Sequence, residues 1–263
     1  MTGFILSCST CCFRNRGRDE IEETLTYAPQ AGYSYIALGG PFTWEPGLIQ
    51  WLDKKKFLEE LSRNNLKLSE VWTPPIPTES LEKALIGAEQ VAKSARVAID
   101  LGCNILVQTG GSRREEGLQN TVTGLKRLLE LISDLDIKIC LEPHINSQIL
   151  TFEDYDKIFS KIDSPKLGIT IDTGHFHSAG VDFIALIKKY SNRIWNIHLK
   201  DHRGKQSVPI GEGEIDIPGL INELRRINYN GFLAVELEVI DSENAPKYVK
   251  DAYRYLAPLI KED

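Results

Sequence analysis

Four residues that commonly bind metal ions stand at the ends of four separate apolar runs in the second half of the sequence. The runs are Ile137–Glu142, Leu167–Asp172, Ile194–His198 and Phe232–Glu236. An ionised side chain without a partner is costly inside a protein, so buried strands ordinarily end in apolar or turn residues. One such ending would carry no information, but four in succession predict that the strands converge on a shared cation.

The predicted ligands are three carboxylates and one imidazole: Glu142, Asp172, His198 and Glu236. Oxygen-rich ligation with a single histidine suits Mn²⁺ or Mg²⁺, with Co²⁺ or Zn²⁺ as competitors. A structural zinc site would contain more sulfur or nitrogen. We therefore expect a divalent metal ion at this site, with Mn²⁺ as the first choice.

The elements that must position these ligands alternate between strand and helix along the whole chain. The predicted strands are Phe4–Ser9, Tyr35–Gly39, Leu66–Trp72, Asn104–Thr109 and the four runs above. The predicted helices are Asp19–Ala31, Leu48–Asn64, Ser80–Leu101, Leu118–Leu135, one opening at Thr151, Asp182–Tyr190, Pro218–Ile227 and Ala245–Ile260. Strands that alternate with helices indicate a parallel sheet with helical crossovers.

Eight strand–helix units in 263 residues predict an α/β fold made of a single closed (β/α)8 TIM barrel, which typically takes about 250 residues. A doubly wound open sheet is the alternative. That fold usually carries a glycine-rich phosphate-binding turn after its first strand, and Ser7–Gly17 contains none. Since no linker or low-complexity tract divides the chain, we expect one domain over residues 1–263. In a barrel the active site lies at the C-terminal ends of the strands, where all four predicted ligands stand.

Two further polar side chains are predicted to lie near the cation, because residues two apart on a strand point the same way. His144 follows Glu142 at this spacing, and Lys200 follows His198. The alternative for His144 is a hydrogen bond to backbone at the barrel rim, and for Lys200 an ion pair with a neighbouring carboxylate.

Trp72 and Gln108 end the third and fourth predicted strands. We expect both to line the substrate pocket, Trp72 as an apolar wall for the face of a sugar. The alternative for both is packing at the barrel rim.

The composition is that of an ordinary globular protein, with 42% hydrophobic and 26% charged residues. A net charge of -6 and a pI near 5.5 give no electrostatic case for binding nucleic acid or an acidic membrane surface. No apolar stretch approaches the roughly 20 residues that a membrane span needs. The N-terminus has no basic region ahead of a hydrophobic segment, as a signal peptide would, so we expect a cytoplasmic protein.

Four short motifs contain most of the predicted site residues. They read Leu-Glu-Pro-His at 141–144, Asp-Thr-Gly-His at 172–175, His-Leu-Lys-Asp at 198–201 and Pro-Ile-Gly-Glu-Gly-Glu-Ile-Asp at 209–216. With these motifs the chain resembles, over essentially its whole length, the xylose-isomerase-like TIM-barrel superfamily. The resemblance is to its sugar isomerase and epimerase branch, which includes tagatose and psicose 3-epimerases, hydroxypyruvate isomerases and inosose enzymes.

The resemblance implies that Glu142, Asp172, His198 and Glu236 are the metal ligands. It also implies that Glu142 and Glu236 act as acid and base, and that His175 binds substrate. A small sugar-like substrate and a homodimer or homotetramer are implied as well. The chain departs from the ketose 3-epimerases at the arginine and the additional glutamate that grip the sugar, since the nearest positions hold Arg203 or Gly204, and Gln148.

Removal of a proton beside a carbonyl group is the chemistry that this set of residues supports. A divalent cation stabilises the developing enediolate oxygen, one carboxylate removes the proton as a general base, and the second returns it. We therefore expect a metal-dependent isomerase or epimerase of a sugar, keto-sugar or related hydroxy-carbonyl compound. A dehydratase or other lyase on a keto-sugar or inosose is the alternative, because loss of a β-hydroxyl can follow the same first step.

A DNA-repair hydrolase resembling endonuclease IV is the remote alternative. Those enzymes hold three zinc ions and need further histidines, one of them at the end of the fourth strand, where this chain has Gln108. The segment Gln206–Pro209 also lacks the Asp-x-His pair that would hold a further zinc ion. The sequence therefore predicts a single cation and no nucleic-acid partner.

Overall fold

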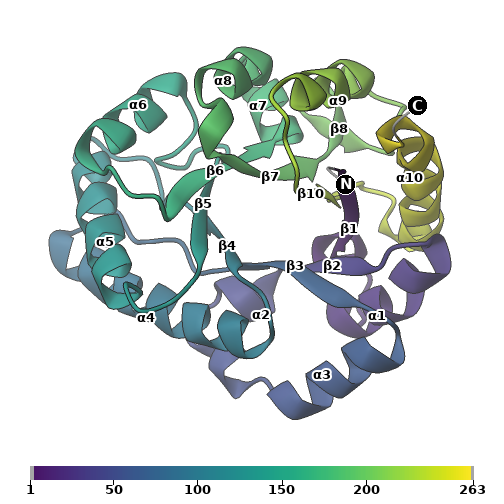
Figure 1. Ribbon diagram of the computed structural model, residues 1–263, viewed down its shortest axis with the longest axis horizontal. Helices are drawn as coiled ribbons and strands as arrows, with labels where there is room; N and C mark the ends of the chain where they lie inside the picture. The colour runs from purple at the N-terminus through teal and green to yellow at the C-terminus, as the bar shows by residue number, and fades with distance from the viewer. Residues whose placement is uncertain (1–2, 262–263) are drawn as a thin grey trace.

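Short aliphatic runs form the eight parallel strands of a barrel in a computed structural model that describes residues 3–261. The strands are β1 (Ile5–Ser9), β2 (Tyr35–Leu38), β3 (Lys67–Trp72), β4 (Ile105–Thr109), β5 (Lys138–Glu142), β6 (Leu167–Asp172), β7 (Ile194–Leu199) and β10 (Phe232–Val235). They are hydrogen-bonded in the order β1-β10-β7-β6-β5-β4-β3-β2, and β2 pairs back with β1, so the sheet is closed (Figure 1). The expectation of an α/β fold with a single (β/α)8 TIM barrel is confirmed.

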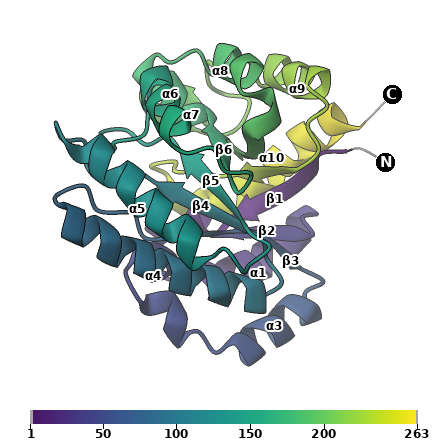
Figure 2. The same ribbon diagram turned by 60° about the vertical axis from the view of Figure 1, so that its left-hand side comes forward.

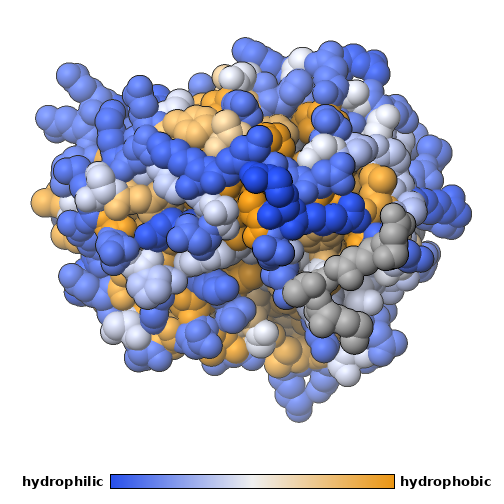
Figure 3. Space-filling model, turned by 45° about the horizontal axis from the view of Figure 1, so that its top comes forward, coloured by the Kyte–Doolittle hydropathy of each residue, from blue (hydrophilic) through white to orange (hydrophobic). Residues whose placement is uncertain are grey.

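Helices surround the barrel and cover its outer face (Figures 1 and 2). They are α1 (Glu20–Ala31), α2 (Pro41–Trp44), α3 (Lys54–Arg63), α4 (Leu81–Asp100), α5 (Gly117–Leu131), α6 (Phe152–Lys161), α7 (Thr173–Ala179), α8 (Phe183–Lys189), α9 (Ile217–Arg226) and α10 (Ala245–Ile260). Four short 3-10 turns, η1 (Thr10–Phe13), η2 (Leu48–Trp51), η3 (Ser191–Arg193) and η4 (Ser242–Asn244), complete the chain. Hydrophilic side chains cover much of the face in Figure 3, with apolar ones between them, as expected when helices bury their apolar sides against strands.

One predicted helix is wrong. Leu48–Asn64 is not a continuous helix, because it divides into η2 and α3 with a break at Leu52 and Asp53. The carboxylate of Asp53 accepts a hydrogen bond from the backbone N–H of Lys56 at 3.1 Å. Aspartate is favourable as the residue that caps a helix N-terminus, so a new helix begins here.

A helix and a hairpin that the sequence did not predict lie beyond the C-terminal ends of β6 and β7. Helix α7 follows β6 without a connecting loop. After β7 the chain forms a small antiparallel hairpin of β8 (Asp201–Arg203) and β9 (Gln206–Val208). Both elements therefore belong to the face where a TIM barrel carries its active site.

Between residues 3 and 261, no helix has both the length and the apolar character that crossing a membrane would require.

Candidate metal centre and active site

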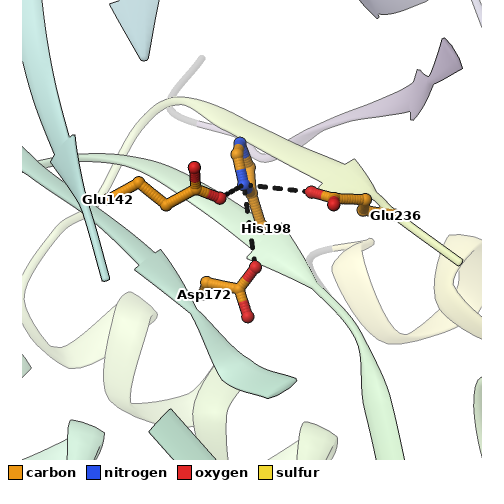
Figure 4. Close-up of side chains that lie close together, drawn as sticks. All are labelled: Glu142, Asp172, His198 and Glu236. Carbon is orange, nitrogen blue, oxygen red and sulfur yellow. Dashed lines mark hydrogen bonds and ion pairs between the residues drawn. The ribbon is translucent and has the colours of Figure 1, made fainter. Parts of the chain in front are cut away.

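The four predicted ligands meet at the C-terminal end of the barrel. Glu142 and Asp172 are the last residues of β5 and β6, His198 lies at the end of β7, and Glu236 follows β10 directly. These strands are neighbours in the ring. All four side chains are buried, and each offers one ligand atom within 4.8 Å of the others (Figure 4). The sequence therefore identified a real cluster.

His198 is the centre of this cluster, and its Nδ1 atom faces the three carboxylates (Figure 4). Nδ1 lies 2.6 Å from Glu142 Oε1, 3.2 Å from Glu236 Oε2 and 3.9 Å from Asp172 Oδ2. Strand pairing brings Asp172 close to His198, because the two residues are direct partners in the β6–β7 register.

Asp172 has two roles, one for each oxygen. Its Oδ1 accepts a hydrogen bond of 2.7 Å from the backbone N–H of His175, which caps the N-terminus of α7. Its Oδ2 is directed toward the cluster. The helix that follows β6 at once therefore fixes the orientation of this carboxylate.

The cluster fits a divalent cation, as shown by its carboxylate oxygens. Glu142 Oε2, Asp172 Oδ2 and both carboxylate oxygens of Glu236 are buried and have no hydrogen-bond partner. Lys200 approaches Asp172 and Glu236 closely, but without the geometry of a hydrogen bond. Buried carboxylate oxygens are costly unless they are paired or bind a metal, and three carboxylates with one imidazole are suitable ligands for such an ion.

The two glutamates of the cluster differ in their electrostatic environment. Burial raises the pKa of Glu142 to about 7, although His198 opposes this shift. Burial acts in the same direction on Glu236, but Lys200 and His198 more than offset it and lower the pKa of Glu236 to about 2. In the protein without a cation, Glu236 therefore stays ionised to lower pH than Glu142.

Lys200 is close to the cluster, as expected from its spacing. Its buried Nζ lies 2.8 Å from Glu236 Oε1, 3.3 Å from Asp172 Oδ2 and 2.7 Å from Glu238 Oε2. Lys200 therefore also forms the ion pair with a neighbouring carboxylate that was expected as the alternative. His175 Nε2 lies 3.5 Å from the same Nζ.

The two histidines predicted to bind substrate lie beside each other. The rings of His144 and His175 have centroids 4.2 Å apart. His144 Nδ1 lies 2.9 Å from the carbonyl oxygen of Ile145, which agrees with a backbone contact at the rim, and His144 also lines a cavity. Both rings are thus near the cluster, and their contact with substrate stays a prediction.

A cavity of about 640 Å³ opens beside the cluster. Residues from α2 and from the ends of β3, β4 and β5 line it, among them Trp44, Trp72, Val107, Thr109 and His144. The four cluster residues do not line it. Trp72 joins the two features, because it borders the cavity and stacks on the His198 ring with centroids 5.3 Å apart and an interplanar angle of 12°.

Gln108 is buried behind the wall of this cavity. Its side-chain oxygen accepts a hydrogen bond from the N–H of Ile76 at 3.1 Å. Its amide nitrogen donates to Thr73 Oγ1 at 2.9 Å and to the carbonyl oxygen of Pro74 at 2.6 Å. Gln108 therefore holds the segment after β3, and it is not among the residues that line the cavity. Its contact with substrate stays a prediction.

Sequence reasoning missed Glu70, a fully buried carboxylate on β3 that lies 2.7 Å from the second ring nitrogen of His198. A signal was present, because Lys67–Trp72 is a strand in which a glutamate stands between buried residues. Glu70 precedes the end of β3 by two residues, whereas the four predicted ligands stand at the ends of their apolar runs.

Comparisons with known proteins agree with this fold. A family model described as "Xylose isomerase-like TIM barrel" matches residues 25–259. An inosose dehydratase from Clostridium tetani is 31% identical and aligns over 85% of this chain and 87% of its own length. Another from Mesomycoplasma hyopneumoniae is 25% identical, over 93% of this chain and 90% of its own.

Among solved structures, a D-allulose 3-epimerase from Methylomonas sp. is 18% identical with a TM-score of 0.80 and 98% coverage of both chains. A probable 3-DHS dehydratase from Bacillus anthracis is 19% identical, with a TM-score of 0.78 and coverage of 97% of this chain and 99% of its own. The IOLI protein with a zinc atom is 18% identical, with a TM-score of 0.80 and 98% coverage of both chains. At these identities the solved structures support the fold alone.

Proposed function

Since the chain belongs to the xylose isomerase-like TIM-barrel family, we propose that it is an enzyme that removes the proton beside the carbonyl group of a keto-polyol with the help of one divalent cation. The observation that carries this proposal is the buried cluster of Glu142, Asp172, His198 and Glu236, with one ligand atom from each within 4.8 Å of the others. We propose Mn²⁺ as the first choice because three of the four ligands are carboxylates.

The four residues of the cluster hold the cation, which when bound supplies Lewis-acid stabilisation of negative charge on the substrate oxygens. Glu142 and Glu236 reach the cluster from β5 and β10, on two sides of His198 (Figure 4). One carboxylate takes the proton as a general base, and the other donates a proton to the intermediate. Lys200 holds Glu236 in place through the contact of 2.8 Å.

Dehydration is the reaction that we place first. In this case the β-hydroxyl of the intermediate accepts a proton and leaves as water. The support is the name of the curated relatives, inosose dehydratase, which align with the chain at 25% to 31% identity in the two cases above. This reverses the order expected from the sequence, where an isomerase or epimerase came first.

Epimerisation or isomerisation is the second candidate, and the placement of the two glutamates favours it. With carboxylates on two sides of one substrate carbon, one carboxylate can remove a proton from one face and the other can return a proton to the opposite face. This inverts the configuration at that carbon. Return of the proton to the neighbouring carbon would instead interconvert an aldose and a ketose. Proton removal is shared by all three outcomes.

The substrate is proposed to be neutral. No lysine or arginine is among the described residues that line the cavity, and its ionisable members are Glu45 and His144. Aromatic and proline side chains, such as Trp44, Trp72 and Pro74, form one part of the lining, and Thr73, Thr109 and Ser112 supply hydroxyl groups. Apolar walls with a few polar groups are typical of sites for small molecules.

A panel of inososes, ketoses and phosphorylated ketoses in D₂O with Mn²⁺, followed by NMR, tests the proposal. An unsaturated or dicarbonyl product formed with loss of water supports dehydration. Deuterium at a carbon without loss of water supports epimerisation or isomerisation. Turnover of phosphorylated ketoses alone would contradict a neutral substrate, and no exchange with any compound would contradict the proposal as a whole.

A further inference from the structure

A carboxylate outside the set of four ligands lies inside the barrel, under the cluster. Glu70 stands on β3 with no solvent exposure. Its Oε1 lies 2.7 Å from His198 Nε2 and accepts a hydrogen bond of 3.1 Å from the indole N–H of Trp72. Its Oε2 accepts a hydrogen bond from the side-chain amide of Asn196, which lies two residues before His198 on β7. We propose that Glu70 is a positioning residue that fixes both the metal ligand His198 and the cavity wall formed by Trp72.

The first side chain that Glu70 orients is His198. An imidazole can bind a cation through only one nitrogen at a time, and the hydrogen bond at its other nitrogen sets which one is free. Nδ1 faces Glu142, Asp172 and Glu236, whereas Nε2 faces Glu70. Donation from Nε2–H to Glu70 therefore leaves the Nδ1 lone pair directed at the cation. A carboxylate partner also makes the ring a stronger ligand.

The second side chain that Glu70 orients is Trp72. Its indole N–H bonds to the same Glu70 oxygen that faces His198, and its ring lies flat on the imidazole, with an angle of 12° between the planes. The edge and the face of the tryptophan are thus both fixed. Because Trp72 also lines the cavity, one carboxylate sets the ligand and the adjoining wall together.

The ion pairs around the cluster distinguish a positioning role of Glu70 from a role in packing alone. Lys200 pairs with Asp172, Glu236 and Glu238. Among the described residues, the ion pair of Glu70 is with His198. A buried carboxylate is costly without a partner, so a residue that served packing alone would be expected to be apolar here.

Glu70→Gln is the variant that tests this inference, which rests on the proposed use of a cation at the site. Glutamine has nearly the same shape, and its oxygen can still accept from Trp72 and His198. The amide of Asn196 can turn to meet the new N–H₂ group, since its own oxygen has no partner now. The variant should therefore fold, while His198 loses its charged partner.

Mn²⁺ binding by titration calorimetry, with no substrate present, is the main measurement. We expect Kd to rise about 10- to 100-fold in Glu70→Gln, the usual effect of removing a carboxylate behind a metal-binding histidine. The matched control is Glu23→Gln, which removes a buried carboxylate that pairs with Arg16 at 2.6 Å, and Kd should not change there. In the Co²⁺-loaded protein, the visible spectrum should shift for Glu70→Gln and not for Glu23→Gln.

Trp72→Phe separates the two parts of the role. It removes the indole N–H and keeps an aromatic face over His198, so Kd for Mn²⁺ should change less than in Glu70→Gln. An unchanged Kd and Co²⁺ spectrum in Glu70→Gln, with Mn²⁺ binding intact in the parent protein, would overturn this inference and leave the proposed function standing. Absence of Mn²⁺ binding in the parent protein would overturn both.

Discussion

Glu142 and Glu236 are chemically identical side chains that the protein places in different surroundings. Lys200 lies 2.8 Å from Glu236, whereas the side chain that contacts Glu142 is His198, at 2.6 Å. Accordingly, the pKa of Glu142 is raised by burial to about 7 and that of Glu236 is lowered to about 2, where Lys200 offsets burial. In the protein without a cation, the two carboxylates are therefore protonated over different pH ranges.

Glu142→Gln and Glu236→Gln should each nearly abolish deuterium exchange beside the substrate carbonyl. Loss of a general acid or base typically costs about 10²- to 10⁴-fold in rate, and each substitution also removes a metal ligand. Exchange is measured by NMR at saturating Mn²⁺, so that weaker metal binding does not limit the result. The control is Glu223→Gln, which removes a buried carboxylate on α9 that is paired with Arg226, outside the cluster. Retention of more than about a tenth of the exchange rate by either variant would contradict its role as acid or base.

Asp201 shows how one side chain can hold an element near the site. Its Oδ2 accepts hydrogen bonds of 2.9 Å from the backbone N–H groups of Gly211 and Gly213, and its Oδ1 accepts one of 3.3 Å from that of Ile215. Gly211 has φ of +88°, a conformation that favours glycine. At Gly213 a Cβ atom would clash with Asp201 Oδ1, so the contact with Asp201 accounts for the second glycine of the motif at 209–216.

Asp201→Ala should therefore destabilise the protein by about 2–4 kcal/mol, because each buried N–H group left without a partner costs about 1–3 kcal/mol and water can satisfy part of the set. Urea unfolding at neutral pH is the measurement. Asp216→Ala is the comparison, since it removes a helix cap with one hydrogen bond to Gly219 and should cost about 1 kcal/mol. An equal loss of unfolding free energy in the two variants would contradict the role of Asp201 in holding the segment at 209–216.

Helices α6 and α8 are joined by a pH-sensitive contact. Asp156 accepts hydrogen bonds of 2.6 and 2.8 Å from Lys189 Nζ, and another from the hydroxyl of Tyr190. The hydrogen bonds from Lys189 and then Tyr190 lower the pKa of Asp156. A folded-state pKa below the unfolded value means that the contact stabilises the fold fully above the unfolded pKa, about 3.9, and that the gain is lost as the pH falls through the folded pKa.

Asp156→Asn should thus lower the free energy of unfolding at neutral pH, and this deficit should be smaller at about pH 3. The contact is partly exposed, with 46% and 44% of the two side chains accessible, so the difference should be below about 1 kcal/mol. Urea unfolding of the variant and the parent protein at both pH values measures it. A deficit that is equal or larger at low pH would show that the contact does not act through this carboxylate's charge.

The elements that the sequence predicted well are those with a strong local pattern. Apolar runs located the eight strands of the barrel, and the polar residues at the ends of four of them located the buried cluster. The break at Asp53 was missed because a helix-compatible pattern continues across it. Glu70 was missed because its partner His198 is 128 positions away in the chain, and only closure of the barrel brings β3 and β7 to face each other across the interior.

The closed barrel gathers negative charge at one end of its interior. Glu142, Asp172 and Glu236 are joined there by Glu70, and all four are buried. Lys200 and His198 balance this charge only in part, and four carboxylate oxygens of the cluster have no hydrogen-bond partner. Like charges that folding brings together oppose folding, so the fold and the cation are expected to stabilise each other.

Addition of Mn²⁺ should therefore raise the thermal unfolding temperature of the chelator-treated protein. A ligand that binds only the folded state adds about 2.7 kcal/mol at 100 times its Kd, and about 1 kcal/mol shifts Tm by roughly 2–4 °C in a chain near this size. An increase of roughly 5–10 °C is expected on this basis, measured by calorimetry with and without Mn²⁺. Asp172→Asn should lose most of the increase, because it weakens a ligand while its other oxygen still caps α7. Equal increases in this variant and the parent protein would place the cation outside the cluster.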